Sequence, residues 1–166
     1  MLKIRLAARD DGTEIIRVRR EAILSKAGTH YDQAAVAAWV GTDTADRLAR
    51  IEREISDPGM IILVAEAGDV TIGFAMAIPA QNELRALYVR PNPVGQVGCA
   101  LLAALEAQAF ETAEFLVCDA SLNAQRFYAA NGYGEEGRKD HVSIPGGVVS
   151  GMVQMRKRRP SAVDPG

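Results

Sequence analysis

Residues 87–102 run from a strand-like segment through a turn that contains glycine into an apolar, helix-like segment. The first N–H groups of a helix have no partner inside the helix and carry the positive end of its dipole, so they bind phosphate or pyrophosphate groups well. Gly95 and Gly98 lack a Cβ and let a ligand approach the backbone closely. A tight turn without a ligand is the alternative interpretation of these glycines, and the residue types alone leave both open.

The segment fits neither of two common nucleotide-binding motifs. It lacks the Gly-Lys-Ser/Thr ending of a nucleoside triphosphate loop, and no Gly-x-Gly-x-x-Gly pattern follows the first predicted strand. Cys99 and Cys118 form no disulfide framework or metal cluster, and His141 has no potential ligands at a suitable spacing. The sequence therefore predicts no metal site, and these residues alone leave open whether the turn binds a phosphate or only reverses the chain.

Residues 121–133 hold a second group of polar and aromatic residues, with Asn123, Phe127 and Tyr128 placed along one predicted helix. The Asn131-Gly132 pair is typical of a helix that ends in a left-handed residue. A capped helix that buries Phe127 in the core is the alternative interpretation of this segment.

The elements that must position these residues follow the order of a mixed α/β (α+β) domain. Segments that alternate or are rich in Val and Ile predict strands, and apolar residues three or four apart predict helices. One helix joins the fourth and fifth strands, which favours a single parallel crossover in a mostly antiparallel sheet. The expected strands are 2–6, 60–66, 71–79, 82–89, 115–118, 134–144 and 148–155, and the expected helices are 15–23, 32–40, 44–55, 97–109 and 121–131.

Composition and charge narrow the class of protein. The 166 residues are 48% hydrophobic and 24% charged, which is typical of one globular domain; we expect it to cover residues 1–156. We interpret the basic run that begins at Arg156, and the polar tail 157–166, as a frayed, solvated end. A net charge of −2 does not favour a nucleic-acid partner. The chain has no membrane-length apolar run and no signal peptide, so a cytoplasmic protein is expected.

The two segments resemble the GNAT superfamily of acetyl-CoA-dependent N-acetyltransferases. Residues 121–133 are similar to the family's Asn-x-x-x-x-Tyr element with its Gly-aromatic pair. In the first segment the turn is one residue shorter than the family's usual form. The residues there that match the family's strand, turn and helix are Leu87, Tyr88, Val89, Pro91, Gly95, Gly98, Ala100, Leu101 and Leu102. The resemblance covers approximately residues 2–155 and implies a GNAT-like sheet flanked by about four helices.

The resemblance implies that acetyl-CoA is the cosubstrate and that no metal takes part. The backbone groups of Leu87 and Val89 would face the acetyl and pantetheine groups, and N–H groups from Val94 to Cys99 would hold the pyrophosphate. Asn123 would hydrogen-bond to the cofactor arm. The full set of expected cofactor-binding residues is Leu87, Tyr88, Val89, Val94, Gly95, Gln96, Val97, Gly98, Cys99, Asn123 and Phe127.

Two residues are the candidates for proton transfer in the implied reaction, which is direct attack of a primary amine on the acetyl group in a ternary complex. In the family a carboxylate near Glu83 often takes the amine proton, usually through water; the alternative is a solvent-facing sheet carboxylate paired with Arg85. Tyr128 occupies the position of the acid that protonates the departing thiolate. A tyrosine that only packs is the alternative for that position.

The acceptor side is less specified. His30 and Tyr31 lie in a region that often borders the family's acceptor pocket, so they are the candidate substrate-binding residues; a merely exposed histidine is the alternative for His30. A small-molecule amine and a peptide N-terminus both fit as acceptor, and no nucleic-acid or membrane partner is expected. Because members of the family often form homodimers, a homodimer is a possible state of this chain. The alternative function is a non-catalytic acyl-CoA-binding sensor or regulatory module, which would bind acetyl-CoA without turnover.

Overall fold

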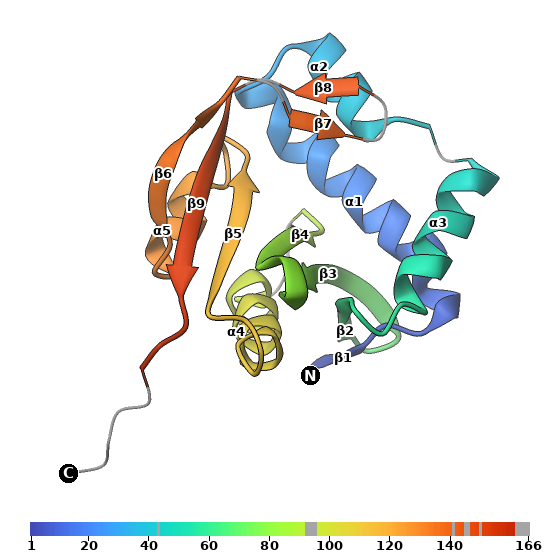
Figure 1. The fold of residues 1–166 in the computed structure, drawn as a ribbon. Helices are drawn as coiled ribbons and strands as arrows, with labels where there is room; N and C mark the ends of the chain where they lie inside the picture. Colours follow the sequence, from blue (N-terminus) through green and yellow to red (C-terminus); the bar gives the residue numbers. More distant parts are fainter. Residues whose placement is uncertain (43, 92–95, 141, 145–146, 150, 162–166) are drawn as a thin grey trace.

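The structure, a computed structural model, describes residues 1–42, 44–91, 96–140, 142–144, 147–149 and 151–161. Seven strands form one sheet (Figure 1), and a separate pair, β7 (Val142–Ile144) and β8 (Gly147–Val149), forms a second. In spatial order the strands of the large sheet are β1 (Leu2–Leu6), β2 (Ile61–Ala67), β3 (Val70–Ile78), β4 (Glu83–Val89), β5 (Phe115–Ala120), β9 (Met152–Arg158) and β6 (Gly134–Lys139).

All neighbours in the large sheet are antiparallel except β4 and β5, which run parallel. This arrangement confirms the predicted mixed, mostly antiparallel sheet with one crossover. The described helices are α1 (Gly12–Lys26), α2 (Gln33–Val40), α3 (Ala45–Ile55), α4 (Val97–Ala109) and α5 (Gln125–Ala130).

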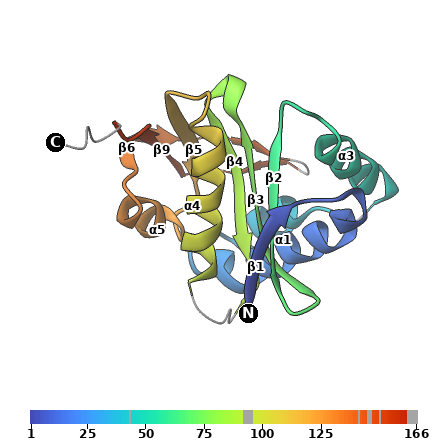
Figure 2. The same ribbon diagram turned by 90° about the horizontal axis from the view of Figure 1, so that it is seen from below.

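Two different layers of helices cover the two faces of the sheet. On one face α4 buries Leu101, Leu102 and Leu105 completely against the inner strands. On the other face α1 and α3 contribute Ile15 and Ile51 to a smaller apolar cluster. Figure 2 shows α3 beyond the β1 end of the sheet, with α5 and β6 at the opposite end. The inner strands β2 to β5 are thus held between the two helical layers.

The last part of the chain differs from the prediction in three places. Residues 121–123 do not begin a helix; they form a turn in which the Ser121 carbonyl accepts from the N–H of Ala124 at 2.9 Å, and α5 begins only at Gln125. The expected long strands 134–144 and 148–155 are each divided. Gly151 adopts φ 75° and donates its N–H to the Lys139 carbonyl, which bends the chain between β8 and β9.

The basic run from Arg156 is not a frayed end. It forms the last residues of β9, which pair with β5. The Arg156 guanidinium lies 4.3 Å from the centre of the Phe115 ring, and Lys157 Nζ lies 2.6 Å from Glu106 Oε2. The partners of these basic side chains come from β5 and α4. Because these partners are distant in the sequence, the residues around Arg156 alone do not indicate that the segment is ordered. None of the described helices is both long and apolar enough to cross a membrane.

Candidate functional site

The sheet opens between β4 and β5. The two strands pair only at Glu83 and Val117, where the Val117 N–H donates to the Asn82 carbonyl at 2.8 Å. On its opposite edge β5 pairs along its whole length with β9. The later residues of β4 therefore have a strand partner on the β3 side only.

A β-bulge decides which backbone groups of β4 face this opening. Met76 of β3 pairs with Ala86 and Ala77 pairs with Leu84, so Arg85 is the extra residue. Farther along, the Arg90 N–H donates to the Ile72 carbonyl, and antiparallel strands alternate the direction of their backbone groups. The N–H and C=O groups of Leu87 and Val89 consequently point away from β3, into the opening, as the sequence analysis expected.

The N-terminus of α4 lies beside this opening. Gln96 is its N-cap and provides no side-chain hydrogen bond, so the N–H groups of the first turn have no partner from the cap. Val97 is buried in the core and contributes only its backbone to this surface. The predicted contacts of Val94 and Gly95 lie outside the described residues.

Gly98 has a packing role that the sequence analysis did not foresee. A Cβ at Gly98 would lie 3.2 Å from Cε2 of the Phe127 ring and 3.8 Å from Val89 Cγ2. The missing side chain thus allows α4 and α5 to approach each other. Nearby, the Asn131 side chain donates to the Phe127 carbonyl at 2.8 Å and lies 3.9 Å from Cys99 Sγ.

Tyr128 and Asn123 are the two candidate residues from the segment around α5, and neither belongs to the described lining of the cavity on the α1 and α3 side of the opening. Tyr128 is buried, and its ring packs edge-on against Phe127 at 5.2 Å and Tyr133 at 5.4 Å. Burial raises the pKa of the Tyr128 phenol well above its usual value, and Cys118 and Tyr88 nearby add to this effect. Asn123 Oδ1 is buried and has no hydrogen-bond partner among the described residues. An unpaired buried acceptor is costly, so a ligand donor is expected there.

A cavity of about 640 Å³ lies on the α1 and α3 side of the opening. Glu83 and Tyr88 line it from β4, Cys118 lines it from β5, and Trp39 lines it from α2. Glu83 accepts a hydrogen bond from Arg85 Nε at 3.2 Å, so the pairing named in the alternative interpretation of Glu83 is present, and its role as a base stays a prediction. Burial raises the pKa of the Cys118 thiol to about 12, which keeps it protonated and unreactive at neutral pH.

The two predicted acceptor residues lie outside the described lining of the cavity. His30 is exposed, and Tyr31 packs edge-on against Trp39 at 5.4 Å. The Tyr31 hydroxyl accepts a hydrogen bond from the Leu122 N–H at 3.0 Å, and burial raises its pKa. Tyr31 thus connects the acceptor side to the turn before α5, and its contact with a substrate stays a prediction.

Three arginines that line the cavity were not predicted as site residues from the sequence; they are Arg19 of α1 and Arg47 and Arg50 of α3. One signal was present in the sequence. Arg47, Arg50 and Glu54 recur at spacings of three and four beside the buried Ile51, so α3 carries charges along its inward edge. Within the described residues, no group of three or more His, Cys, Asp or Glu side chains is arranged to hold a metal.

A family model and a solved structure both match this chain to acetyltransferases. The family model described as acetyltransferase (GNAT) domain matches residues 27–144. A GCN5-related N-acetyltransferase structure from Rhodopseudomonas palustris is 31% identical, covers 95% of both chains and has a TM-score of 0.82. The search of curated proteins found no match.

Two more distant structures support the fold. The PaiA N-acetyltransferase from Thermoplasma acidophilum, in complex with coenzyme A, is 21% identical over 96% of this chain and 99% of its own, with a TM-score of 0.74. A ribosomal-protein-alanine N-acetyltransferase from Brucella melitensis is 23% identical over 95% and 99%, with a TM-score of 0.68.

Proposed function

The chain belongs to the GNAT family of acetyltransferases, and from this premise we propose that it transfers the acetyl group of acetyl-CoA to a primary amine by direct attack in a ternary complex. The observation that carries the proposal is the opening between β4 and β5, which places unpaired backbone groups of β4 beside a cavity that contains Glu83. A donor entering from the α4 side and an acceptor in the cavity would meet there.

The residues on the α4 side fit acetyl-CoA. The uncapped first turn of α4 suits the pyrophosphate, because its N–H groups have no protein partner from the cap. The backbone groups of Leu87 and Val89 suit the amides of the pantetheine arm, and Asn123 Oδ1 is a buried acceptor in need of a donor. When bound, acetyl-CoA supplies a thioester carbonyl that an amine can attack.

An amine acceptor needs to lose a proton before it attacks. At pH 7 only roughly one alkylamine in a thousand is neutral, a deficit of about 4–5 kcal/mol. We assign Glu83 as the base, acting directly or through water, because it is the cavity carboxylate carried by β4 itself. The N–H groups of β4 that face the opening are suited to stabilise negative charge on the acetyl oxygen.

We assign Tyr128 as the acid that protonates the leaving thiolate. The phenol is protonated at neutral pH, and the influence of Cys118 of β5 and Tyr88 of β4 on its pKa supports a position near both strands. A protonated group at this position can donate, whereas an ionised one would repel the thiolate.

Thiol release from acetyl-CoA, measured over a panel of amines, amino acids, aminoglycosides and short peptides, tests the function. We expect turnover with at least one acceptor. We also expect that Glu83→Gln and Tyr128→Phe lower kcat by about 10²–10⁴-fold with little change in the Kd of acetyl-CoA. Glu111→Gln, on an exposed residue after α4, is the control and leaves kcat unchanged. Acetyl-CoA binding without turnover of any amine would favour the sensor alternative, and absence of both would refute the proposal.

A further inference from the structure

The charges that line the cavity indicate which class of amine it accepts. We infer that the acceptor is a small amine that also carries an anionic group, a carboxylate or a phosphoryl group, and that Arg19 and Arg47 bind this anion. The inference rests on the proposed function, because it assigns the acceptor of the same site.

The cavity has the opposite charge to the chain as a whole. The chain has a net charge of −2, yet its described cavity lining holds five cationic side chains and three carboxylates. Electrostatic attraction within a partly enclosed cavity therefore favours an anion over a polycation. The cations are Arg19, Arg47, Arg50, Arg85 and Lys139, and the carboxylates are Glu54, Glu83 and Asp119.

The three carboxylates already have cationic partners within this lining. Asp119 lies 2.8 Å from Lys139 Nζ, and Glu83 lies 3.2 Å from Arg85 Nε. Glu54 lies 3.8 Å from Arg85 and 3.9 Å from Arg50. No carboxylate among the described residues pairs with Arg19. A bound anion would therefore give this guanidinium an ionic partner.

Arg19 and Arg47 reach the same point from two helices. Arg19 donates from Nη2 to the Trp39 carbonyl at 2.7 Å and from Nη1 to the Val40 carbonyl at 3.3 Å, and Arg47 Nη1 donates to that same Val40 carbonyl at 2.7 Å. Two guanidinium groups that share one acceptor present neighbouring cationic N–H donors, and an anion can accept charge-assisted hydrogen bonds from both. The carbonyls at the end of α2 thus orient both groups before a ligand arrives.

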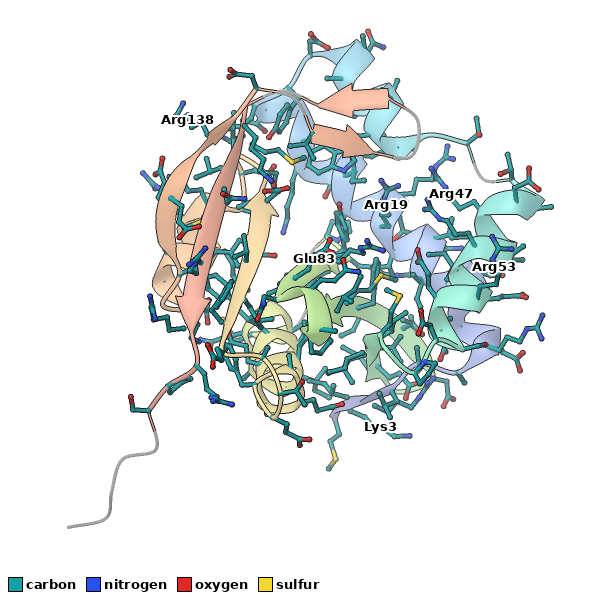
Figure 3. The ribbon with its side chains drawn as sticks, viewed as in Figure 1. Lys3, Arg19, Arg47, Arg53, Glu83 and Arg138 are labelled. Atoms are coloured by element: carbon teal, nitrogen blue, oxygen red, sulfur yellow. The ribbon has the colours of Figure 1, made fainter. Side chains whose placement is uncertain are left out.

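The position of Arg19 suits an acceptor that reaches β4. Its Cζ atom lies 5.9 Å from the centre of the Tyr88 ring, and Tyr88 lies between Leu87 and Val89. In Figure 3, Arg19 and Arg47 lie on the side of the cavity formed by α1 and α3, and Glu83 lies on the β4 side. An anion held by the arginines would leave the amine of a short molecule directed towards Glu83.

Matched pairs of acceptors test the inference on the unaltered protein. Each pair consists of an amino acid and its carboxamide, compared at equal concentration of the neutral amine, with an aminoalkylphosphonate and a polyamine in parallel. We expect kcat/KM to be about 10- to 100-fold higher for the anionic member, because the carboxamide loses charge-assisted hydrogen bonds. The phosphonate separates a phosphoryl site from a carboxylate site. Equal or better turnover of the carboxamide or the polyamine would overturn the inference while leaving acetyl transfer intact.

Variants then assign the effect to the arginines. Arg19→Gln and Arg47→Gln should each raise KM for the anionic acceptor about 10- to 100-fold, with a small change in kcat, and Arg19→Lys should have a smaller effect because it keeps the charge. Arg53→Gln, on the exposed side of α3, is the matched control. An unchanged KM in Arg19→Gln and Arg47→Gln would contradict the assignment, provided thermal melting confirms that both variants are folded.

A binding experiment keeps the inference separate from the proposed function. Trp39 is the chain's single tryptophan, it lines the cavity, and its carbonyl binds Arg19. Titration of its fluorescence with an amino acid and with its carboxamide needs no turnover. A saturable change with the anionic member that Arg19→Gln weakens supports the inference even if no amine is acetylated. The same response to both members, or no response to either, would refute it.

Discussion

On the α4 face of the sheet, Leu101 and Leu105 are completely inaccessible, whereas on the α1 and α3 face Arg19 and Arg47 lie beside the apolar side chains. The first face positions the uncapped first turn of α4 and the free backbone groups of β4. Backbone N–H groups suit a constant ligand such as the pyrophosphate of acetyl-CoA, which is the same in every reaction cycle. The second face carries both arginine and glutamate side chains along the cavity. The comparison indicates that the α4 face provides a rigid frame and the α1 and α3 face provides selectivity.

The largest expected difference between the two faces is in stability. Leu101→Ala opens a cavity in a fully buried cluster and should lower the free energy of unfolding by about 2–5 kcal/mol. Leu48→Ala, on the half-buried inner side of α3, should cost about 1 kcal/mol because less apolar surface is lost. Urea denaturation of both variants gives the two values. Equal losses would mean that the faces are equally well packed.

A smaller effect is expected from adding a methyl group at a close approach of two elements. In Gly98→Ala the new Cβ meets the rigid Phe127 ring at 3.2 Å, so the first turn of α4 must shift. We expect the Kd of acetyl-CoA, measured by calorimetry, to rise about fivefold, or about 1 kcal/mol.

Gly12→Ala is the matching change on the other face. Its Cβ would lie 2.9 Å from the flexible end of the Leu48 side chain and in ordinary contact with Glu52 and Ile51 at 3.7 Å, so the Kd of acetyl-CoA should not change. If Gly98→Ala also left this Kd unchanged, the N-terminus of α4 would not be positioned by its contact with Phe127.

The smallest effect concerns an ion pair where β1 meets the start of α1. Arg5 binds both Asp11 carboxylate oxygens, at 2.7 and 2.9 Å, and these hydrogen bonds lower the pKa of Asp11. A lowered pKa in the folded state adds stability above the unfolded pKa of about 3.9, and this stability is lost as the pH falls through the lower folded pKa. Asp11→Asn should therefore cost about 0.5–1 kcal/mol at pH 7.

The dependence on pH tests this assignment. The difference between the original protein and Asp11→Asn, measured by urea denaturation, should shrink below about pH 4. The exposed Asp69 in the turn between β2 and β3 provides the control Asp69→Asn, for which no such change is expected. A difference that persists at low pH would show that the loss has another origin than the charge of Asp11.

The α4 face was easier to predict from the sequence than the opposite face. The spacing of Leu101, Leu102 and Leu105 reports directly on a buried helix, because local periodicity and burial agree there. Arg19 stands in a run with Arg17 and Arg20 that is typical of a solvated helix, and only the position of α2 reveals its carbonyl partners. Arg156 was misjudged for the same reason, since Phe115 is distant in the sequence.

The predicted site residues also differ in how well the sequence located them. The family pattern assigned the backbone groups of Leu87 and Val89 to the cofactor. The structure turns these groups away from β3 into the opening, and their contact with acetyl-CoA stays a prediction. His30 and Tyr31 were chosen by their position in the chain alone, and the described cavity lining does not contain them. The catalytic roles of Glu83 and Tyr128 stay predictions. Glu83 lines the cavity, whereas Tyr128 is buried against Phe127 and Tyr133, outside the described lining.

The extra residue at Arg85 makes the register of β4 against β3 as important as the identity of its residues. If Arg85 paired with Met76 in an unbroken ladder instead of forming a bulge, every later residue of β4 would shift by one position and exchange its two sides. Leu87 and Val89 would then turn their backbone groups towards β3, and Ala86 and Tyr88 would take their places at the opening. The bulge at Arg85 is therefore the feature that turns the backbone groups of Leu87 and Val89 into the opening, whatever side chains those two residues carry.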